Sequence, residues 1–303
     1  MGDSQTHSNN GNSSASGAPR EARVAVLSLL TGALIWGLIW YPYRILRDAG
    51  LDGVVASTAT YSVAFILGLF FFRHSLTGFR PTWSLFWLAL TAGGCNLGYV
   101  MATLSGEVVR VLLLFYLAPL WTVLLARLML RERLSRIGVA VVLLSLCGAT
   151  TMLWEPQVGW PVPQDAADWL GLGAGFFFAL FNVLSRQTQG ASIEIKSMSA
   201  FAGVFVVGAL LIAAGIGQPR MPEGASSWLL VILIACVLVV VNLVVQYGLS
   251  HVAANRAIVI MLSEIGFAAL ASWLLADEAI GLRELCGGAM ILLASVYSAR
   301  MGK

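Results

Sequence analysis

Two charged side chains lie inside apolar runs of the sequence and could take part in chemistry. Glu264 sits midway along the run 252-275, and Arg110 lies near the start of the run 107-129. A charged group at the centre of a membrane helix costs about 2.5 to 3.5 kcal/mol even on lenient insertion scales, so something must compensate it. Glu264 could bind a substrate amine, or take up and release a coupling proton, because burial disfavours the charged form of a carboxylate. It could also be a protonated group that only hydrogen-bonds a neighbouring helix.

Arg110 admits two interpretations. It could form an ion pair with Glu107, which lies one turn earlier on a helix. It could instead bind a substrate carboxylate at the outer mouth of a cavity. Pro119 lies in the same run and removes the hydrogen bond from its own amide to the carbonyl of Phe115, which predicts a bend near the middle of that helix.

Uncharged polar and aromatic side chains at helical spacing complete the predicted substrate-binding set. They could hydrogen-bond a zwitterionic solute, or simply hold membrane helices together. Asn242 and Gln246, for example, are four residues apart and therefore share one helix face. The predicted set comprises Trp36, Tyr61, Asn96, Tyr99, Arg110, Tyr116, Pro119, Asn182, Asn242, Gln246 and Glu264.

The composition places these residues in a membrane. The chain is 58% hydrophobic and 11% charged with a mean hydropathy of +0.84, whereas soluble domains are about a quarter charged. No HExxH, GxSxG, Walker A or GxGxxG stretch is present, and no His/Cys/carboxylate group has metal-ligand spacing. We therefore expect no cofactor, no bound metal and no enzymatic activity. No basic patch interleaved with aromatics predicts a nucleic-acid partner.

Apolar windows of about 20 residues predict an all-α membrane protein with ten transmembrane helices. The polar residues 1-22 before them predict a disordered tail. Most Lys and Arg residues fall on the side of the N-terminus, which predicts that both termini are cytoplasmic. The predicted spans are 24-43, 54-72, 83-104, 107-129, 136-154, 168-186, 197-216, 227-249, 252-275 and 284-300.

Polar residues repeat along the chain. A shift of 146 residues places Asn96 on Asn242, Arg110 on Arg256 and Glu132 on Glu278. The sequence therefore predicts two five-helix copies, 23-154 and 168-300. Because five is odd, the second copy enters the membrane upside down, and such inverted repeats are typical of secondary transporters with a binding site near the midplane.

The same segments carry a family resemblance. "FYLAPLWTVLLARLMLRERLSRIGVAVVLLSLCGA" (115-149) and "AANRAIVIMLSEIGFAALASWLLADEAIGLRELCGGAMILLA" (253-294) resemble the repeated block of the drug/metabolite transporter superfamily, EamA type. "LIWGLIW" (34-40) and "GFFFALFNVLSR" (175-186) resemble the first helix of each of its repeats. One departure is that the family's central proline is Pro119 in the first copy but Ile265 in the second.

The resemblance implies a ten-helix basket whose central cavity is lined by the first, third and fourth helices of each copy. It also implies transport without ATP, commonly export of amino acids and related metabolites. We therefore expect an inner-membrane exporter, coupled to protons or working by exchange, with a small molecule and the lipid bilayer as partners and a monomeric or homodimeric state.

Two alternatives on the same fold stay open. One is uptake of a small vitamin, nucleoside or carboxylate, for which Arg110 would attract the anionic group. The other is flipping of a lipid-linked substrate. A receptor or scaffold is disfavoured, because ten helices leave no room for a folded output domain.

Overall fold

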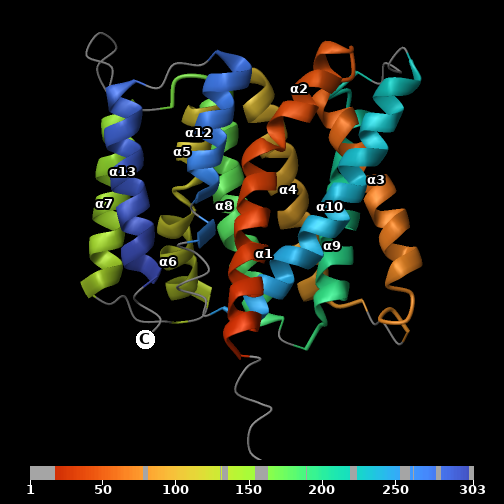
Figure 1. Ribbon diagram of the computed structural model, residues 1–303, viewed down its shortest axis with the longest axis horizontal. Helices are drawn as coiled ribbons and strands as arrows, with labels where there is room; N and C mark the ends of the chain where they lie inside the picture. The colour runs from red at the N-terminus through yellow and green to blue at the C-terminus, as the bar shows by residue number, and fades with distance from the viewer. Residues whose placement is uncertain are drawn as a thin grey trace, which may run out of the picture.

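The computed structural model describes residues 18–77, 81–129, 131, 136–153, 163–188, 190–218, 224–252, 260–261, 263–277 and 281–299. Within these ranges every regular element is helical and no strand occurs. The helices stand side by side in one bundle (Figure 1). Their bounds are α1 (Ala18–Leu38), α2 (Trp40–Asp48), α3 (Gly53–Phe71), α4 (Trp83–Ser105), α5 (Val108–Phe115), α6 (Ala118–Met129), α7 (Arg136–Leu153), α8 (Ala166–Gln187), α9 (Ile193–Ala213), α10 (Ala225–His251), α12 (Ser263–Ala276) and α13 (Leu282–Ala299).

Many of these helices have the length and composition of membrane spans. Seven spans of this kind occur among the described residues: Arg23–Asp48, Gly53–Phe71, Trp83–Ser105, Arg110–Met129, Ala166–Ser185, Ile193–Ala213 and Ala225–Val245. Shorter apolar helices, Val139–Gly148, Ser263–Ala276 and Leu285–Ala294, overlap the other three predicted spans. The all-helical, multi-pass membrane fold is thus confirmed, while the full set of ten spans and their inverted arrangement remain predictions.

Large apolar side chains point outward along these helices. Leu210, Leu229 and Leu233 are each more than half exposed, as are Phe70 and Phe71. In water such a surface would drive aggregation, but in a bilayer it faces lipid tails at no cost. The apolar outer surface therefore agrees with the membrane location that the composition predicts.

The chain ahead of the bundle is described only in part. α1 begins at Ala18, inside the segment predicted as a disordered tail, so residues 18–22 are helical. Residues 1–17 of that tail lie outside the described residues. So do Arg256, Glu132 and Glu278, three of the residues on which the predicted repeat was based.

The fourth predicted span is interrupted near its middle. α5 ends at Phe115 and α6 begins at Ala118, with Tyr116 and Leu117 in a turn between them. The Leu117 amide donates to the Leu114 carbonyl at 3.2 Å, a tighter turn than an α-helix makes. The interruption lies about one turn before Pro119, where a missing amide hydrogen was expected to bend the helix.

Helix pairs in the two halves of the chain pack in a corresponding way. α1 packs on α10 and α12, and α8 packs in the corresponding way on α4, α5 and α6. The α1–α2 unit ends beside the C-terminus of α4, where the Arg47 side chain contacts the Leu104 carbonyl. α8 begins at that same end of the bundle, because its Asp168 bonds Arg110 of α5. α1 and α8 therefore run in opposite directions (Figure 1).

Two arginines of α2 satisfy the C-terminal carbonyls of α4. Arg44 donates to the Thr103 carbonyl at 3.4 Å and to the Gly106 carbonyl at 3.3 Å, and its guanidinium lies 4.8 Å from the centroid of the Trp40 ring. Helix C-termini favour such cations, because their last carbonyls have no partner in the helix. The charge bias predicts few arginines on the outer side of the membrane, and this capping role explains why Arg44 and Arg47 occur there.

Gly203 lets α9 approach α4 closely. A Cβ on Gly203 would overlap the carbonyl oxygen of Ala89, and small residues at such crossings allow membrane helices to pack. We expect Gly203→Ala to lower the free energy of unfolding by about 1–3 kcal/mol, because backbone must move to admit the methyl group. Heating the purified protein in detergent, followed by size-exclusion chromatography, measures the loss.

The matched control is Gly173→Ala on α8, where a Cβ would have nothing within 4 Å. That substitution should leave the midpoint of thermal unfolding unchanged or slightly raised, since alanine is the better helix former. Equal midpoints for the Gly203 and Gly173 variants would contradict the close approach of α9 to α4.

Candidate functional site

Glu264 is buried inside the bundle and is hydrogen-bonded to Tyr116. The Tyr116 hydroxyl donates to Glu264 Oε2 at 2.7 Å, and the two residues are 9% and 8% exposed. Glu264 lies in the first turn of α12 and Tyr116 in the turn between α5 and α6. Among the described residues, no Lys or Arg forms an ion pair with Glu264. A carboxylate in this position can be neutralised by a proton or by a cationic ligand.

Two side chains of α4 also lie near Glu264. Cys95 and Tyr99 lie within electrostatic range of the carboxylate. The Tyr99 hydroxyl is buried and has no hydrogen-bond partner among the described residues. Such an orphan is uncommon in native interiors. Tyr99, Tyr116 and Glu264, three residues of the predicted set, are therefore brought together.

Aromatic rings form one wall of this region. Phe115 packs against the rings of Tyr99, Tyr116 and Phe178 at centroid distances of 5.5, 5.6 and 5.2 Å. Phe178 belongs to α8, so the wall joins both halves of the chain. Apolar and aromatic walls with a few polar groups are typical of small-molecule sites.

The first helix passes close to Glu264. A Cβ on Gly37 would lie 2.9 Å from the Glu264 carbonyl oxygen and 3.1 Å from the Ala268 amide nitrogen. The backbones of α1 and α12 can come this close because position 37 has no side chain. Trp36, the adjacent predicted residue, is half-buried and packs against the hydrophobic core.

Asn96 and Asn242 form corresponding hydrogen bonds in the two halves. Asn96 of α4 accepts from Ser57 of α3, and its Nδ2 donates to the Tyr61 hydroxyl at 2.9 Å. Asn242 of α10 accepts from Ser197 of α9 at 2.7 Å. Both asparagines therefore join neighbouring helices, as expected of polar side chains that hold membrane helices together.

The remaining predicted residues are only partly placed. Asn182 is half-buried on α8. Pro119 and Gln246 lie on α6 and α10, but their side chains are outside the part of the chain that the structure describes. In the described part, no group of three His, Cys, Asp or Glu residues could hold a metal ion.

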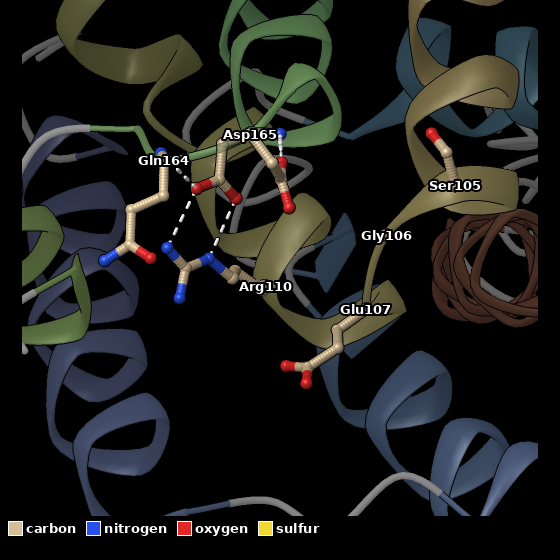
Figure 2. A pocket seen from close by; sticks show the side chains of 7 residues that line it. Ser105, Gly106, Glu107, Arg110, Gln164 and Asp165 are labelled. Carbon is tan, nitrogen blue, oxygen red and sulfur yellow. Dashed lines mark hydrogen bonds and ion pairs between the residues drawn. The ribbon is translucent and has the colours of Figure 1, made fainter.

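Arg110 lies at one end of the bundle and bonds Asp168 with both prongs of its guanidinium. Nε and Nη2 donate to Asp168 Oδ1 and Oδ2, each at 2.8 Å (Figure 2). The Arg110 and Asp168 side chains are 16% and 2% exposed. Two parallel charge-assisted bonds of this kind are strong and directional. A substrate carboxylate would have to compete with Asp168 for this fork.

A hollow of about 340 Å³ adjoins this ion pair, and it is lined by Ser105, Gly106, Glu107, Arg110, Gln164, Asp165 and Asp168. Glu107, the partner considered from the sequence, lines the same hollow (Figure 2). Asp165 caps α8 by accepting from the Asp168 amide at 2.8 Å, and Asp168 accepts from the Gln164 amide at 3.0 Å. Three carboxylates and one guanidinium thus surround this opening.

Asp168 and Cys95 do not belong to the predicted substrate-binding set. The signal for Asp168 was present as the pattern Asp165-x-x-Asp168 ahead of an apolar run, which is typical of a helix start. Its partner Arg110 lies 58 residues earlier, and no local pattern indicates that pairing. Cys95 carried no signal beyond its place in an apolar run.

The comparisons with known proteins agree with this architecture. The model of the EamA-like transporter family matches the chain twice, at residues 23–154 and 165–300. Protein RarD of Salmonella typhimurium is 24% identical over 82% of both chains, and the Bacillus subtilis protein described as "Uncharacterized transporter YojE" is 25% identical over 70% of this chain and 72% of its own length. An Archaeoglobus fulgidus protein described as "Uncharacterized transporter" is 30% identical over 70% of this chain and 75% of its own.

One solved crystal structure superposes on this chain with a TM-score of 0.63. The sequence identity is 16%, and the superposition covers 91% of this chain and 98% of that one. This likeness shows the fold alone.

Proposed function

Because this chain belongs to the EamA-like transporter family of the drug/metabolite transporter superfamily and is a multi-pass membrane transporter, we propose that it exports a small, amino-acid-like metabolite. Export would proceed by alternating access across the inner membrane, coupled to protons or to exchange of a second solute. Ten spans arranged as two inverted copies, 23–154 and 168–300, would form the translocation path.

Three observations support the inverted copies. The family model matches each half separately. α1 and α8, the first helices of the two halves, run in opposite directions, and the hydrogen bond from Ser57 to Asn96 recurs as the bond from Ser197 to Asn242. α1 begins and α13 ends at the same end of the bundle (Figure 1), as an even number of spans requires. Both termini would then be cytoplasmic by the charge bias.

The buried Glu264 is the observation that carries the transport mechanism. It joins the two halves through Tyr116 in the interior, where a carboxylate is costly and marks ion or substrate pathways in membrane proteins. We place the substrate beside it, within reach of the orphan hydroxyl of Tyr99. The carboxylate would take a substrate amine, a coupling proton, or both in turn.

The other predicted residues would contribute the walls of the path. Trp36 and Tyr61 would add aromatic surface, and Asn96, Asn182, Asn242 and Gln246 would add hydrogen bonds. Pro119 would shape the path through the interruption between α5 and α6. Arg110 would act at the mouth of the path, where Asp168 already holds its guanidinium.

Metabolite profiles of cells and medium test this proposal. A strain that overexpresses the chain should accumulate one amino-acid-like compound outside the cells at least severalfold above a strain that carries the Glu264→Gln variant. A deletion strain should retain that compound inside. Identical profiles in all three strains would contradict export.

Membrane vesicles then separate export from the alternatives. Everted vesicles should take up the labelled compound, and right-side-out vesicles should not accumulate it. Accumulation only in right-side-out vesicles would indicate uptake of a vitamin, nucleoside or carboxylate. Transfer of a lipid-linked sugar between leaflets, without release of any soluble compound, would indicate flipping.

A further inference from the structure

We propose that Arg110 and Asp168 form a latch that holds α5 against α8 in the closed state of one end of the bundle and opens during each transport cycle. The proposal rests on the proposed transport function, since a static channel or scaffold would need no such opening. Four features of this end of the molecule carry it.

The latch is a discrete contact rather than a diffuse surface attraction. Both bonds are 2.8 Å long, and each oxygen of the Asp168 carboxylate accepts from one nitrogen of the planar Arg110 guanidinium. The Asp168 side chain is 2% exposed, so solvent screens the pair little. Such a contact is either made or broken, as the two states of a gate require.

The pair joins the two halves of the chain. Arg110 belongs to the segment 23–154 and Asp168 to the segment 165–300, the two separate matches to the family model. Alternating access rocks one repeat against the other, so contacts between the halves at either end must form and break. Arg110–Asp168 is a contact of this class at the end where α4 finishes and α8 begins.

A small cluster of buried apolar residues, called the plug below, adjoins the latch. Ala102, Val111 and Ala167 pack together and are all at most 3% exposed. Val111 follows Arg110 and Ala167 precedes Asp168, so the two latch helices carry two of the three plug residues, and Ala102 of α4 supplies the third. A Cβ on Gly106 would lie 2.6 Å from the Ala167 Cβ, which shows how tightly this end is closed.

The hollow described above is next to the latch, since Arg110 and Asp168 line it. Its volume of about 340 Å³ falls within the range of small-molecule sites, about 300–1,000 Å³. The latch residues form part of its lining, and the plug residues Val111 and Ala167 are their immediate neighbours in the chain. In the open state, the hollow would connect with the region around Glu264.

Asp168→Asn removes the ion pair with Arg110 but keeps the hydrogen bond that the side chain makes at the start of α8. The Asp168 carboxylate also accepts from the Gln164 amide at 3.0 Å, and an asparagine oxygen can still accept that bond. The asparagine carries no charge and offers only one acceptor oxygen, so the two-pronged ion pair is lost. Arg110 lines the hollow and can then be hydrated there.

The latch can be tested by cysteine accessibility at the plug. In a chain whose four native cysteines are replaced by alanine, Val111→Cys puts a smaller thiol behind the latch without crowding. The purified protein in lipid nanodiscs is treated with a methanethiosulfonate that carries a fixed positive charge. Because both membrane faces are open to water in nanodiscs, the result does not depend on orientation.

We expect Asp168→Asn to raise the rate of modification at position 111 at least tenfold. The matched control is Asp48→Asn, which removes an exposed ion pair with Arg47 at the same end of the bundle and should change the rate less than twofold. Equal rates in the Asp168 and Asp48 variants would overturn the latch. If Asp168→Asn does not fold, Arg110→Lys serves instead, because lysine keeps the charge but loses the two-pronged geometry. This variant should raise the rate of modification at position 111 at least threefold. An unchanged rate would also overturn the latch.

A reversible cross-link across the latch provides a second test. Ser105 and Ala166 are both exposed and flank the Gly106–Ala167 contact, so cysteines placed there can be bridged by a short bifunctional thiol reagent. Bridging should stop export, and a reductant should restore it. Export that continues at the unbridged rate would overturn the latch, whereas a protein that exports nothing in either state but passes the accessibility test would contradict only the proposed function.

Discussion

Replacement of Glu264 by glutamine is expected to lower export at least tenfold while the protein still folds. Glutamine has nearly the same shape, and its side-chain oxygen can still accept the hydrogen bond that Tyr116 donates at 2.7 Å. It can neither compensate a substrate amine nor release a proton. Residual export should also lose the part of its pH dependence that arises from titration of this carboxylate.

Initial rates of uptake into everted vesicles, measured across a range of pH with the compound identified by metabolite profiling, test this expectation. Glu194→Gln is the matched control, because Glu194 lies half-buried in the first turn of α9 and has no place in the proposed path. Tyr116→Phe should give a smaller loss than Glu264→Gln, since it removes one hydrogen bond and leaves the carboxylate. Export at the wild-type rate at every pH would rule out a transport role for Glu264.

Replacement of Arg110 by leucine is expected to destabilise the fold strongly. The change leaves Asp168, whose side chain is 2% exposed, as a buried carboxylate without its cation. Breaking a buried pair in this way costs about 3–5 kcal/mol. The midpoint of thermal unfolding in detergent should fall clearly below that of the Gly203→Ala variant.

The companion variants separate the charge from the packing. Adding Asp168→Asn to Arg110→Leu should recover a large part of the lost stability, because no uncompensated charge then remains buried. Asp48→Asn removes a pair whose side chains are 43% and 71% exposed, and it should change the free energy of unfolding by less than about 1 kcal/mol. An Arg110→Leu protein as stable as the Asp48 variant would show that the Arg110–Asp168 pair contributes little.

Glu264 and the Arg110–Asp168 pair lie at different points along the same proposed path. Glu264 lies in the interior, and its replacement should affect flux without stability. The Arg110–Asp168 pair closes one end, and the loss of one partner should affect stability, opening or both. A flux defect in Arg110→Lys at unchanged stability would agree with a latch, whereas an equal loss of both would agree with a purely structural pair.

Local sequence features predicted the membrane character and the break in one helix. Apolar runs of about 20 residues indicate spans because the backbone must satisfy its own hydrogen bonds in lipid. Pro119 predicted a bend near the middle of its helix, because a proline removes one amide donor, and the helix is interrupted between α5 and α6, about one turn before Pro119. The resemblance of segments 115–149 and 253–294 to one repeated block predicted the family, which the family model confirms.

The sequence alone therefore determined that the chain is a helical membrane transporter of this family, and it singled out Glu264 and Arg110 as costly charges. Only the tertiary structure decided their partners, Tyr116 at a separation of 148 residues and Asp168 at 58. The physical reason is that helices such as α9, α10 and α12 have apolar residues on every side, so their composition does not show which face turns inward. The rotation of each helix depends on close packing at small residues, and that packing sets which polar groups meet.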